Sequence, residues 1–213
     1  MDVQLGLRER KKARTRRAIS EAAIALFLER GYDSVSVAEI AAAAEVSKRT
    51  LFAYFPTKDD LVLHRFADHE DEPARVVRGR EPGESPLDAL HRYLLSRLDD
   101  RDPISGLCDM PQVVAFYRLV LDTSSLRGAL LQYQTRGEHA LASALLETTP
   151  PGPHAELTAR LAAVQVLAAL RTLGHENQRR ISAGSSADEL EQEARAAADH
   201  AFDLLRRGIA AYA

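Results

Sequence analysis

Apolar side chains in this chain recur every three to four residues, which is the spacing of one buried face of a helix. The first such stripe follows Arg14 and stops before Gly31, a residue that favours helix termination. It consists of Ile19, Ala22, Ala23, Leu26 and Phe27. No segment combines the alternation of a strand with an enrichment in β-branched residues. The pattern therefore predicts an all-α protein, with its first helix over 14–30.

Two short helices are predicted after this stripe. Ser36 and Glu39 form a capping-box pattern at the start of a helix over 37–44. Ser47 then provides an N-cap for a helix over 48–54. Only a tight turn separates the two. Helix, turn and helix in this order is the arrangement that places the second helix in the major groove of DNA.

Positive charge gathers where such a motif needs it. The chain has a formal net charge of −3, but residues 8–17 hold seven Lys or Arg side chains against the single acid Glu9. Lys48 and Arg49 add two cations at the start of the second short helix. DNA phosphates respond to the local charge within a Debye length of roughly 8 Å and not to the net charge of the whole chain. The alternative is a solvated basic tail.

The rest of the chain continues the helical pattern. A linker is predicted over 68–85, where Pro and Gly are frequent, and it divides the chain into 1–66, with a basic arm over 1–13, and 67–213. A fourth helix is expected to follow Thr57. Later helices are expected from Pro86 onward and over 110–121, 124–147, 154–180 and 187–212.

The run between Val37 and Leu61 has a specific spacing of apolar, hydroxyl and aromatic residues. It reads Val37-x-x-Ile40-Ala41-x-x-Ala44-x-Val46-Ser47-x-x-Thr50-Leu51-Phe52-x-Tyr54-Phe55-x-x-Lys58-x-x-Leu61. Together with the preceding helix, this run resembles the N-terminal domain of the TetR family of bacterial transcription regulators over residues 10–66. The resemblance implies a helix-turn-helix head followed by an all-α ligand-binding and dimerisation domain.

The resemblance also implies which side chains meet DNA. Base contacts are expected from Lys48 and Arg49, because Arg can donate two hydrogen bonds to guanine and Lys can do so less rigidly. The alternative is that either one binds only phosphate. The expected phosphate contacts are Ser36, Thr50, Tyr54, Lys58, Arg14 and Arg17. For each of these residues the alternative is a structural role, in which Ser36 only caps a helix and Tyr54 only packs.

Two positions depart from the usual family pattern. Glu45 stands where most members have Gly, so it must adopt a positive φ at some cost or shift the turn. Phe52 stands where many members have a tyrosine whose hydroxyl meets phosphate. That contact is therefore not expected here.

A dimer is predicted because one helix-turn-helix reads only a few base pairs. The helix over 154–180 is apolar on two sides between Leu157 and Leu173, so it needs two neighbours. With the helix over 187–212 it can form a four-helix bundle across a two-fold axis. The alternative is that both helices fill a monomer core. The predicted interface consists of Leu161, Val164, Ala168, Leu190, Ala194, Ala197, Ala201, Leu204 and Leu205.

If the resemblance holds, the helices over 86–147 enclose a pocket for a small-molecule effector. Between Ala115 and Leu146 the pattern faintly resembles regulators of acyl-CoA-like ligands. Candidate polar anchors in the pocket are Tyr93, Arg97, Tyr117, Arg118, Tyr133, Arg136, His139 and Arg171. The alternative for each is a place at the surface or in a pair between helices. No cofactor is predicted. The hypothesis is a cytoplasmic homodimeric repressor released from its operator by a small apolar or acyl-type molecule; the alternative is an activator or a ligand-independent regulator of the same fold.

Other classes of protein are disfavoured. The sequence has no Gly-rich phosphate loop, no nucleophile elbow and no Cys/His metal spacing, so an enzyme is a distant alternative. A metal between His64 and Asp68 is a minor one. The longest apolar stretch, 161–170, contains Gln165 and is far shorter than the ~20 residues of a membrane span. The single cysteine and the charged N-terminal region are typical of a cytosolic protein.

Overall fold

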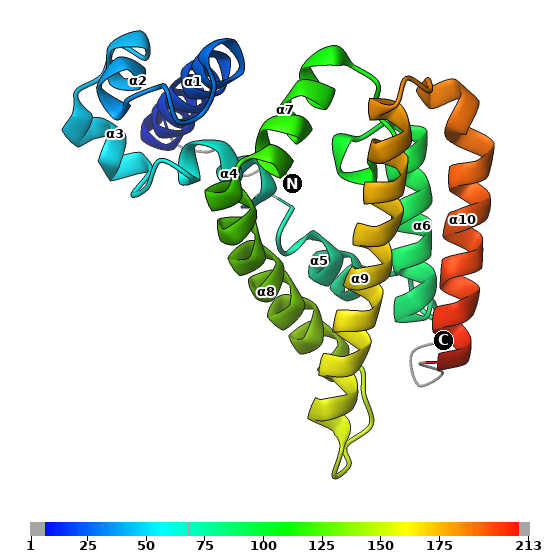
Figure 1. The fold of residues 1–213 in the computed structure, drawn as a ribbon. Helices are drawn as coiled ribbons and strands as arrows, with labels where there is room; N and C mark the ends of the chain where they lie inside the picture. Colours follow the sequence, from blue (N-terminus) through cyan, green and yellow to red (C-terminus); the bar gives the residue numbers. More distant parts are fainter. Residues whose placement is uncertain (1–6, 68, 209–213) are drawn as a thin grey trace. The chain divides into compact units, whose positions relative to one another are not determined.

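The computed structural model describes residues 7–67 and 69–208, and every regular element within them is helical (Figure 1). The predicted all-α fold class is confirmed. In chain order the elements are α1 (Leu7–Arg30), α2 (Val37–Ala43), α3 (Lys48–Tyr54), α4 (Asp60–Ala67), α5 (Glu72–Arg78), α6 (Pro86–Asp99), the 3-10 turn η1 (Pro103–Ser105), α7 (Pro111–Asp122), α8 (Ser124–Leu146), α9 (Ala155–Ser182) and α10 (Ala187–Gly208).

The chain forms two compact units. The described part of the first comprises residues 7–66 and 115–131, and that of the second comprises 67, 69–114 and 132–208. The division predicted from the sequence placed everything after residue 66 in the second part. In the structure, the end of α7 and the start of α8 are grouped with α1 to α4.

The first unit, called the head below, is built around the apolar stripe of α1. Helix α1 packs against α2, and α2 packs against α3. Ile19 and Phe27 of α1, Ile40 of α2 and Leu51 of α3 are all buried in this head. The helix begins at Leu7, seven residues before the predicted start. Its first turns carry no apolar stripe, but Arg, Lys and Glu are good helix formers and continue the helix in solvent.

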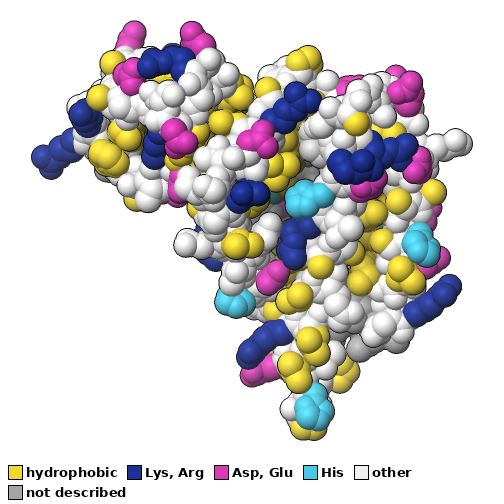
Figure 2. Space-filling model, viewed as in Figure 1, with side chains coloured by type: hydrophobic (Ala, Val, Ile, Leu, Met, Phe, Trp, Pro, Cys, Tyr) yellow, Lys and Arg dark blue, Asp and Glu magenta, His cyan; other side chains and the backbone are white. Residues whose placement is uncertain are grey.

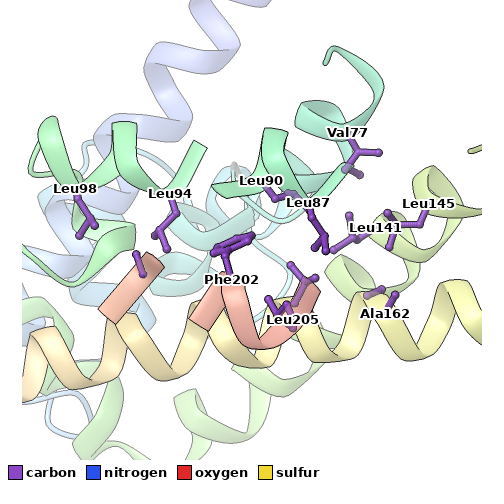
Figure 3. Close-up of a cluster of buried hydrophobic side chains, with 14 of the residues drawn as sticks. Val77, Leu87, Leu90, Leu94, Leu98, Leu141, Leu145, Ala162, Phe202 and Leu205 are labelled. Carbon is purple, nitrogen blue, oxygen red and sulfur yellow. The ribbon is translucent and has the colours of Figure 1, made fainter. Parts of the chain in front are cut away.

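The second unit places α6, α9 and α10 side by side (Figure 1). Figure 3 shows its core, in which Leu87, Leu90 and Leu94 of α6 meet Phe202 of α10. His91 stacks on Phe202 with a centroid distance of 4.7 Å. Further core residues come from α5, α8 and α9, among them Val77, Leu141, Leu145 and Ala162.

The predicted linker over 68–85 contains a helix, α5, which the sequence analysis missed. Pro73 was taken as a breaker, but it lies in the first turn of α5, where a proline ring fits and no amide donor is lost. Ala74 and Val77 lie one turn apart and are both buried. Burial of these apolar groups stabilises a helix that is too short to be stable alone.

Candidate nucleic-acid interface

The predicted capping box opens α2. The Ser36 hydroxyl accepts a hydrogen bond from the Glu39 amide at 3.3 Å, and the Glu39 carboxylate accepts one from the Ser36 amide at 2.8 Å. Arg30 of α1 donates a further bond to Glu39 at 2.7 Å. The Ser36 bonds, with help from Arg30, lower the pKa of Glu39 to about 2. These bonds fix the start of α2 against the end of α1.

The turn between α2 and α3 keeps its tight geometry without a glycine. Glu45 adopts a φ of 53°, in the left-handed region that glycine enters without strain. The Val46 amide then donates to the Ala41 carbonyl at 2.9 Å. Of the two possibilities raised by the sequence, the structure shows that Glu45 adopts the positive φ.

Ser47 positions the start of α3. Its hydroxyl accepts a hydrogen bond from the Thr50 amide at 3.0 Å and lies 2.8 Å from the Thr50 hydroxyl. Leu51 points into the core, whereas Lys48 and Arg49 are exposed at the N-terminal end of the helix. This end also carries the positive pole of the helix dipole. Both predicted base-reading side chains are therefore presented together on one open surface.

The structure gives the predicted phosphate contacts different surroundings. Ser36 and Thr50 are in capping hydrogen bonds, and Tyr54 is half-buried. The Lys58 ammonium donates to the Tyr32 carbonyl at 2.6 Å and lies 4.2 Å from the centre of the Tyr32 ring. Lys58 therefore has a structural contact in the head that the sequence did not indicate.

The cations of α1 form an exposed group. Arg14 and Arg17 are three residues apart and lie on neighbouring positions of the helix, with Arg10 one turn earlier. Figure 2 shows Lys and Arg side chains projecting from the surface of this unit. The guanidinium of Arg16 instead lies 5.3 Å from the centre of the Phe55 ring within the same unit. The part of the predicted arm over 7–13 is helical, and residues 1–6 lie outside the described residues.

A hydrogen-bonded cluster joins the start of α8 to the head. Asp59 accepts hydrogen bonds from the Tyr32 hydroxyl and, at 3.2 Å, from the Ser125 hydroxyl. Burial and the bond to Asp59 raise the pKa of Tyr32. No local pattern could have predicted this cluster, because its members are far apart in the sequence.

An aromatic cluster makes a second connection within the same unit. Phe66 of α4 stacks on Phe116 of α7 with a centroid distance of 5.8 Å and meets Tyr117 edge-on at 6.3 Å. Arg65 lies 5.7 Å from the centre of the Phe116 ring. Tyr117 was predicted to line an effector pocket, but here it packs within the head unit, and Arg118 is exposed beside it.

The other predicted pocket residues lie in the second unit, and three of them are arginines in ion pairs. Arg97 contacts Asp102 at 3.0 Å, Arg136 contacts Glu70 at 2.9 Å, and Arg171 contacts Glu138 at 3.2 Å. His139 is exposed. Their further contacts include those of Tyr93 with Glu72, of Arg97 with Asp100 and with the Tyr93 ring, and of Arg136 with the Tyr133 ring.

Tyr93 is half-buried and held by a hydrogen bond. Its hydroxyl donates to Glu72 at 2.9 Å, and Glu72 also contacts His69 at 2.7 Å. Burial, followed by the negative charge of Glu72, raises the pKa of Tyr93. A separate open hollow of about 650 Å³ lies at the turn between α8 and α9, where Leu146, Pro151 and Leu157 contribute to its lining. None of the eight predicted pocket residues lines this hollow.

The predicted dimer residues divide into two groups. Leu190, Ala194 and Leu205 are buried in the core of their own unit and are not available to a partner. The physical reason is that the apolar stripe of α10 is used against α6 and α9. Residues of the second group are at the surface or half-buried: Leu161, Val164, Ala168, Ala197, Ala201 and Leu204.

The exposed apolar residues of α9 also explain its hydropathy. By length and composition alone α9 could cross a membrane, with a mean hydropathy of 1.2 over its most apolar window, and the core helix of a soluble protein passes the same test. Ala159, Ala162 and Val166 of this helix pack into the core, while Leu161 and Val164 are exposed. The helix is thus apolar on two sides, as the sequence predicted.

Metal ligands do not gather within 7–67 and 69–208, where no group of three His, Cys, Asp or Glu side chains is placed to hold an ion. Asp68, the partner considered for His64, lies outside the described residues. The Nδ1 atom of His64 is instead 3.1 Å from the Ser20 hydroxyl.

Comparison with known proteins places this geometry among DNA-binding regulators. A family model described as bacterial regulatory proteins of the tetR family matches residues 19–64. The chain is similar to the HTH-type transcriptional regulator TcmR of Streptomyces glaucescens, with 35% identity over 136 residues, or 62% of this chain and 58% of TcmR. It is also similar to the HTH-type transcriptional repressor LfrR of Mycolicibacterium smegmatis, with 35% identity over 99 residues, or 46% of this chain and 49% of LfrR. The matches span about half the length of these relatives.

Solved structures share the fold over most of the chain. Native NalD, the secondary repressor of the MexAB-OprM multidrug efflux pump in Pseudomonas aeruginosa, has a TM-score of 0.54 and 18% identity, with 93% of this chain and 96% of NalD covered. GusR of Salmonella enterica has a TM-score of 0.53 and 19% identity, with 92% and 94% covered. At these identities the likeness shows the fold alone.

Proposed function

Since this chain belongs to the TetR family of bacterial regulatory proteins, we propose that it is a cytoplasmic transcriptional repressor that binds an inverted-repeat operator as a homodimer. The observation that carries this proposal is the exposed start of α3, where Lys48 and Arg49 stand clear of the core behind the Ser47 cap. Proteins of this family are regulators and not enzymes, so no catalytic residue is assigned.

In the proposed complex, the first residues of α3 enter the major groove. Arg49 donates two hydrogen bonds to a guanine, and Lys48 contacts a neighbouring base. Ser36, Thr50 and Tyr54 are proposed to bind phosphates around the groove, together with Arg14 and Arg17 of α1. Lys58 is a weaker candidate, because leaving the Tyr32 carbonyl and ring would cost its present contacts.

The proposed dimer uses the exposed side of α9 and the adjoining part of α10. The exposed fraction is 54% for Leu161 and 43% for Val164. Small side chains at Ala168 and Ala201 let a partner helix approach closely. Two copies joined in this way would present two heads to successive half-sites of one duplex.

The proposed effector is a small apolar or acyl-type molecule bound in the second unit. Arg97, Arg136 and Arg171 already pair with carboxylates, so a charged head group would have to displace an acidic side chain. A neutral effector would not have to displace an acidic side chain. The expected coupling of about 1–3 kcal/mol would change operator affinity roughly 5- to 150-fold. We propose that α4 transmits this coupling between effector binding and operator affinity, since α4 ends where the two units divide along the chain.

The direct test is selection of bound fragments from a pool of random duplex DNA. An inverted repeat among the selected sequences would support a symmetric dimer. Arg49→Ala should then weaken binding to the selected duplex by about 5- to 150-fold for each half-site, the value of one bidentate base contact, and relax the preference at one base pair of each half-site. The proposal would be contradicted if the selection yielded no sequence and the protein retained no duplex even in dilute salt.

The effector part has its own measurement. Neutral apolar compounds that raise the melting temperature of the protein are first identified, and operator affinity is then measured with and without each compound. Unchanged affinity with every stabilising compound would contradict ligand-controlled release, while DNA binding itself would stand.

A further inference from the structure

Phe52 is an unusual side chain in this fold because its ring faces solvent. It is 47% exposed on α3, whereas Phe27, Phe55 and Phe202 are buried, and Phe66 and Phe116 are half-buried in ring contacts. Within the part of the chain that the structure describes, Phe52 has no ring or cation contact. A single exposed apolar residue is common on protein surfaces. Phe52 is of interest because it lies on the surface that the proposed function turns toward DNA.

Phe52 lies at the centre of the surface that the proposed function turns toward DNA. It follows Lys48 by four residues and Arg49 by three, so the three side chains are neighbours on one face of the helix. Ala53 continues this face and is also exposed, while Leu51 points the other way into the core. The exposed face of α3 therefore combines two cations with an apolar patch.

The chemistry of a phenyl ring limits what it can recognise in the major groove. It has no hydroxyl or amide, so it cannot hydrogen-bond a phosphate or the polar edge of a base. The apolar group that base pairs present in this groove is the 5-methyl of thymine, which side chains such as Phe and Ala contact. We propose that Phe52, with Ala53 beside it, recognises the 5-methyl group of a thymine in the operator. The inference rests on the proposed function and deepens its base recognition.

The spacing on α3 also locates the thymine. Four residues of helix advance about 6 Å, and bases on one strand are about 3.4 Å apart. The thymine should therefore lie about two base pairs from the base that Lys48 contacts. Its methyl group gives the protein sequence information that the cationic contacts cannot supply.

The test uses the full-length protein and a synthetic duplex of the sequence selected from random DNA. Each thymine is replaced singly by deoxyuridine, which removes the methyl group and keeps every hydrogen bond of the base pair. At one position per half-site the affinity should fall about fourfold, the value of one buried methyl-sized group. Replacement in both half-sites should lower it about 15-fold if the two contributions are independent.

Two variants assign the effect to the ring. In Phe52→Ala and in Phe52→Gln, the same replacement should lower affinity by clearly less than fourfold, because the ring is lost and only small apolar groups such as Ala53 remain near the methyl group. Leu28→Ala removes another exposed apolar side chain of the same unit and should keep the full deoxyuridine effect. Melting curves of the three variants confirm that each is folded.

The outcomes separate this inference from the function beneath it. If the wild type binds the duplex but tolerates deoxyuridine at every position, methyl recognition is wrong and the DNA-binding proposal stands. An undiminished penalty in both Phe52 variants would assign the methyl contact to another side chain and overturn the inference. If the wild type retains no duplex at all, the proposed function fails and takes the inference with it.

Discussion

At the scale of single residues, Glu45 carries the tight turn of the helix-turn-helix motif in a conformation that suits glycine. Its φ of 53° lets the chain reverse direction between α2 and α3, and the Val46 amide reaches the Ala41 carbonyl. For a residue with a Cβ atom, this region costs about 1–2 kcal/mol. The motif therefore retains its geometry with a strained residue at the turn.

Relief of this strain should be measurable. Glu45→Gly is expected to raise the free energy of unfolding by about 0.5–1 kcal/mol, because glycine removes the steric cost but loses more backbone entropy on folding. Glu45→Ala, which keeps the Cβ atom, is the matched control and should not gain stability. Urea denaturation gives both values. A glycine variant no more stable than the alanine variant would show that the turn holds no strain.

Glu39 should make the stability of the head depend on acid. Its pKa is about 2 in the folded protein because of the Ser36 bonds and Arg30. A carboxyl group with a lowered pKa stabilises the fold above its unfolded pKa of about 4.3, and this contribution disappears as the pH falls toward 2. Glu39→Gln should therefore lower the melting temperature at pH 7, with a difference that shrinks between pH 4.3 and 2.

The control for this measurement is Glu21→Gln, which neutralises an exposed carboxylate of α1 outside the capping box. Its melting temperature should follow the wild type at each pH. A gap between wild type and Glu39→Gln that stays constant down to pH 2 would contradict the role given to the charged form of Glu39.

At the scale of elements, α1 extends well before its apolar stripe begins. Its first turns carry cations in place of apolar residues, and Arg14 and Arg17 are exposed there. A helix fixes the spacing of these charges, so they can meet phosphates without the loss of chain entropy that a disordered tail would suffer. We expect this end of α1 to contribute affinity but no sequence preference.

This expectation concerns the salt dependence of binding. Replacing both Arg14 and Arg17 by Ala should weaken binding to selected and random duplexes alike, and should reduce the slope of log affinity against log salt by about two units per subunit, or about four for the proposed dimer. Lys58→Ala offers a comparison, because its ammonium contacts Tyr32 and should affect stability more than the slope. An unchanged slope in the double variant would mean that α1 does not reach the phosphates.

The sequence predicted the long helices well, because each has an apolar stripe and a capping or breaking residue near its ends. The missed helix α5 is short, and its apolar contacts depend on other segments. The grouping of 115–131 with α1 to α4 could not be predicted either, since the bonds around Asp59 join residues distant in the chain. For the site, the pattern located Lys48 and Arg49 at an exposed helix start, but it could not show that Lys58 contacts Tyr32.

At the scale of the whole molecule, the exposed apolar side of α9 is the surface that we propose a second copy covers. The same helix contributes to the core of its own unit through Ala162 and Val166, which leaves Leu161 and Val164 on the other side. A second copy that covers this side would remove these side chains from water, with each fully buried Leu or Val worth about 1.5–3 kcal/mol. The proposed dimer follows from this distribution.

Introducing a charge on this side should separate the subunits. Leu161→Glu is expected to convert the dimer to a monomer at micromolar concentration, because two carboxylates related by the two-fold axis would be buried near each other. Sedimentation or light scattering measures the mass. Leu131→Glu, at a position 62% exposed outside α9, should remain dimeric. A Leu161→Glu protein with the mass of the wild type would place the interface elsewhere.

The grouping of 115–131 with the head has a consequence for exchanging parts between proteins. Val120 and Leu126 are buried residues of that segment, and Ser125 contacts Asp59. A chimera cut at residue 66 would carry α1 to α4 without 115–131, and it would therefore lack Val120, Leu126 and the Ser125 bond to Asp59. We therefore expect a transfer of this head to another protein to fold only if 115–131 is moved together with the residues before 67.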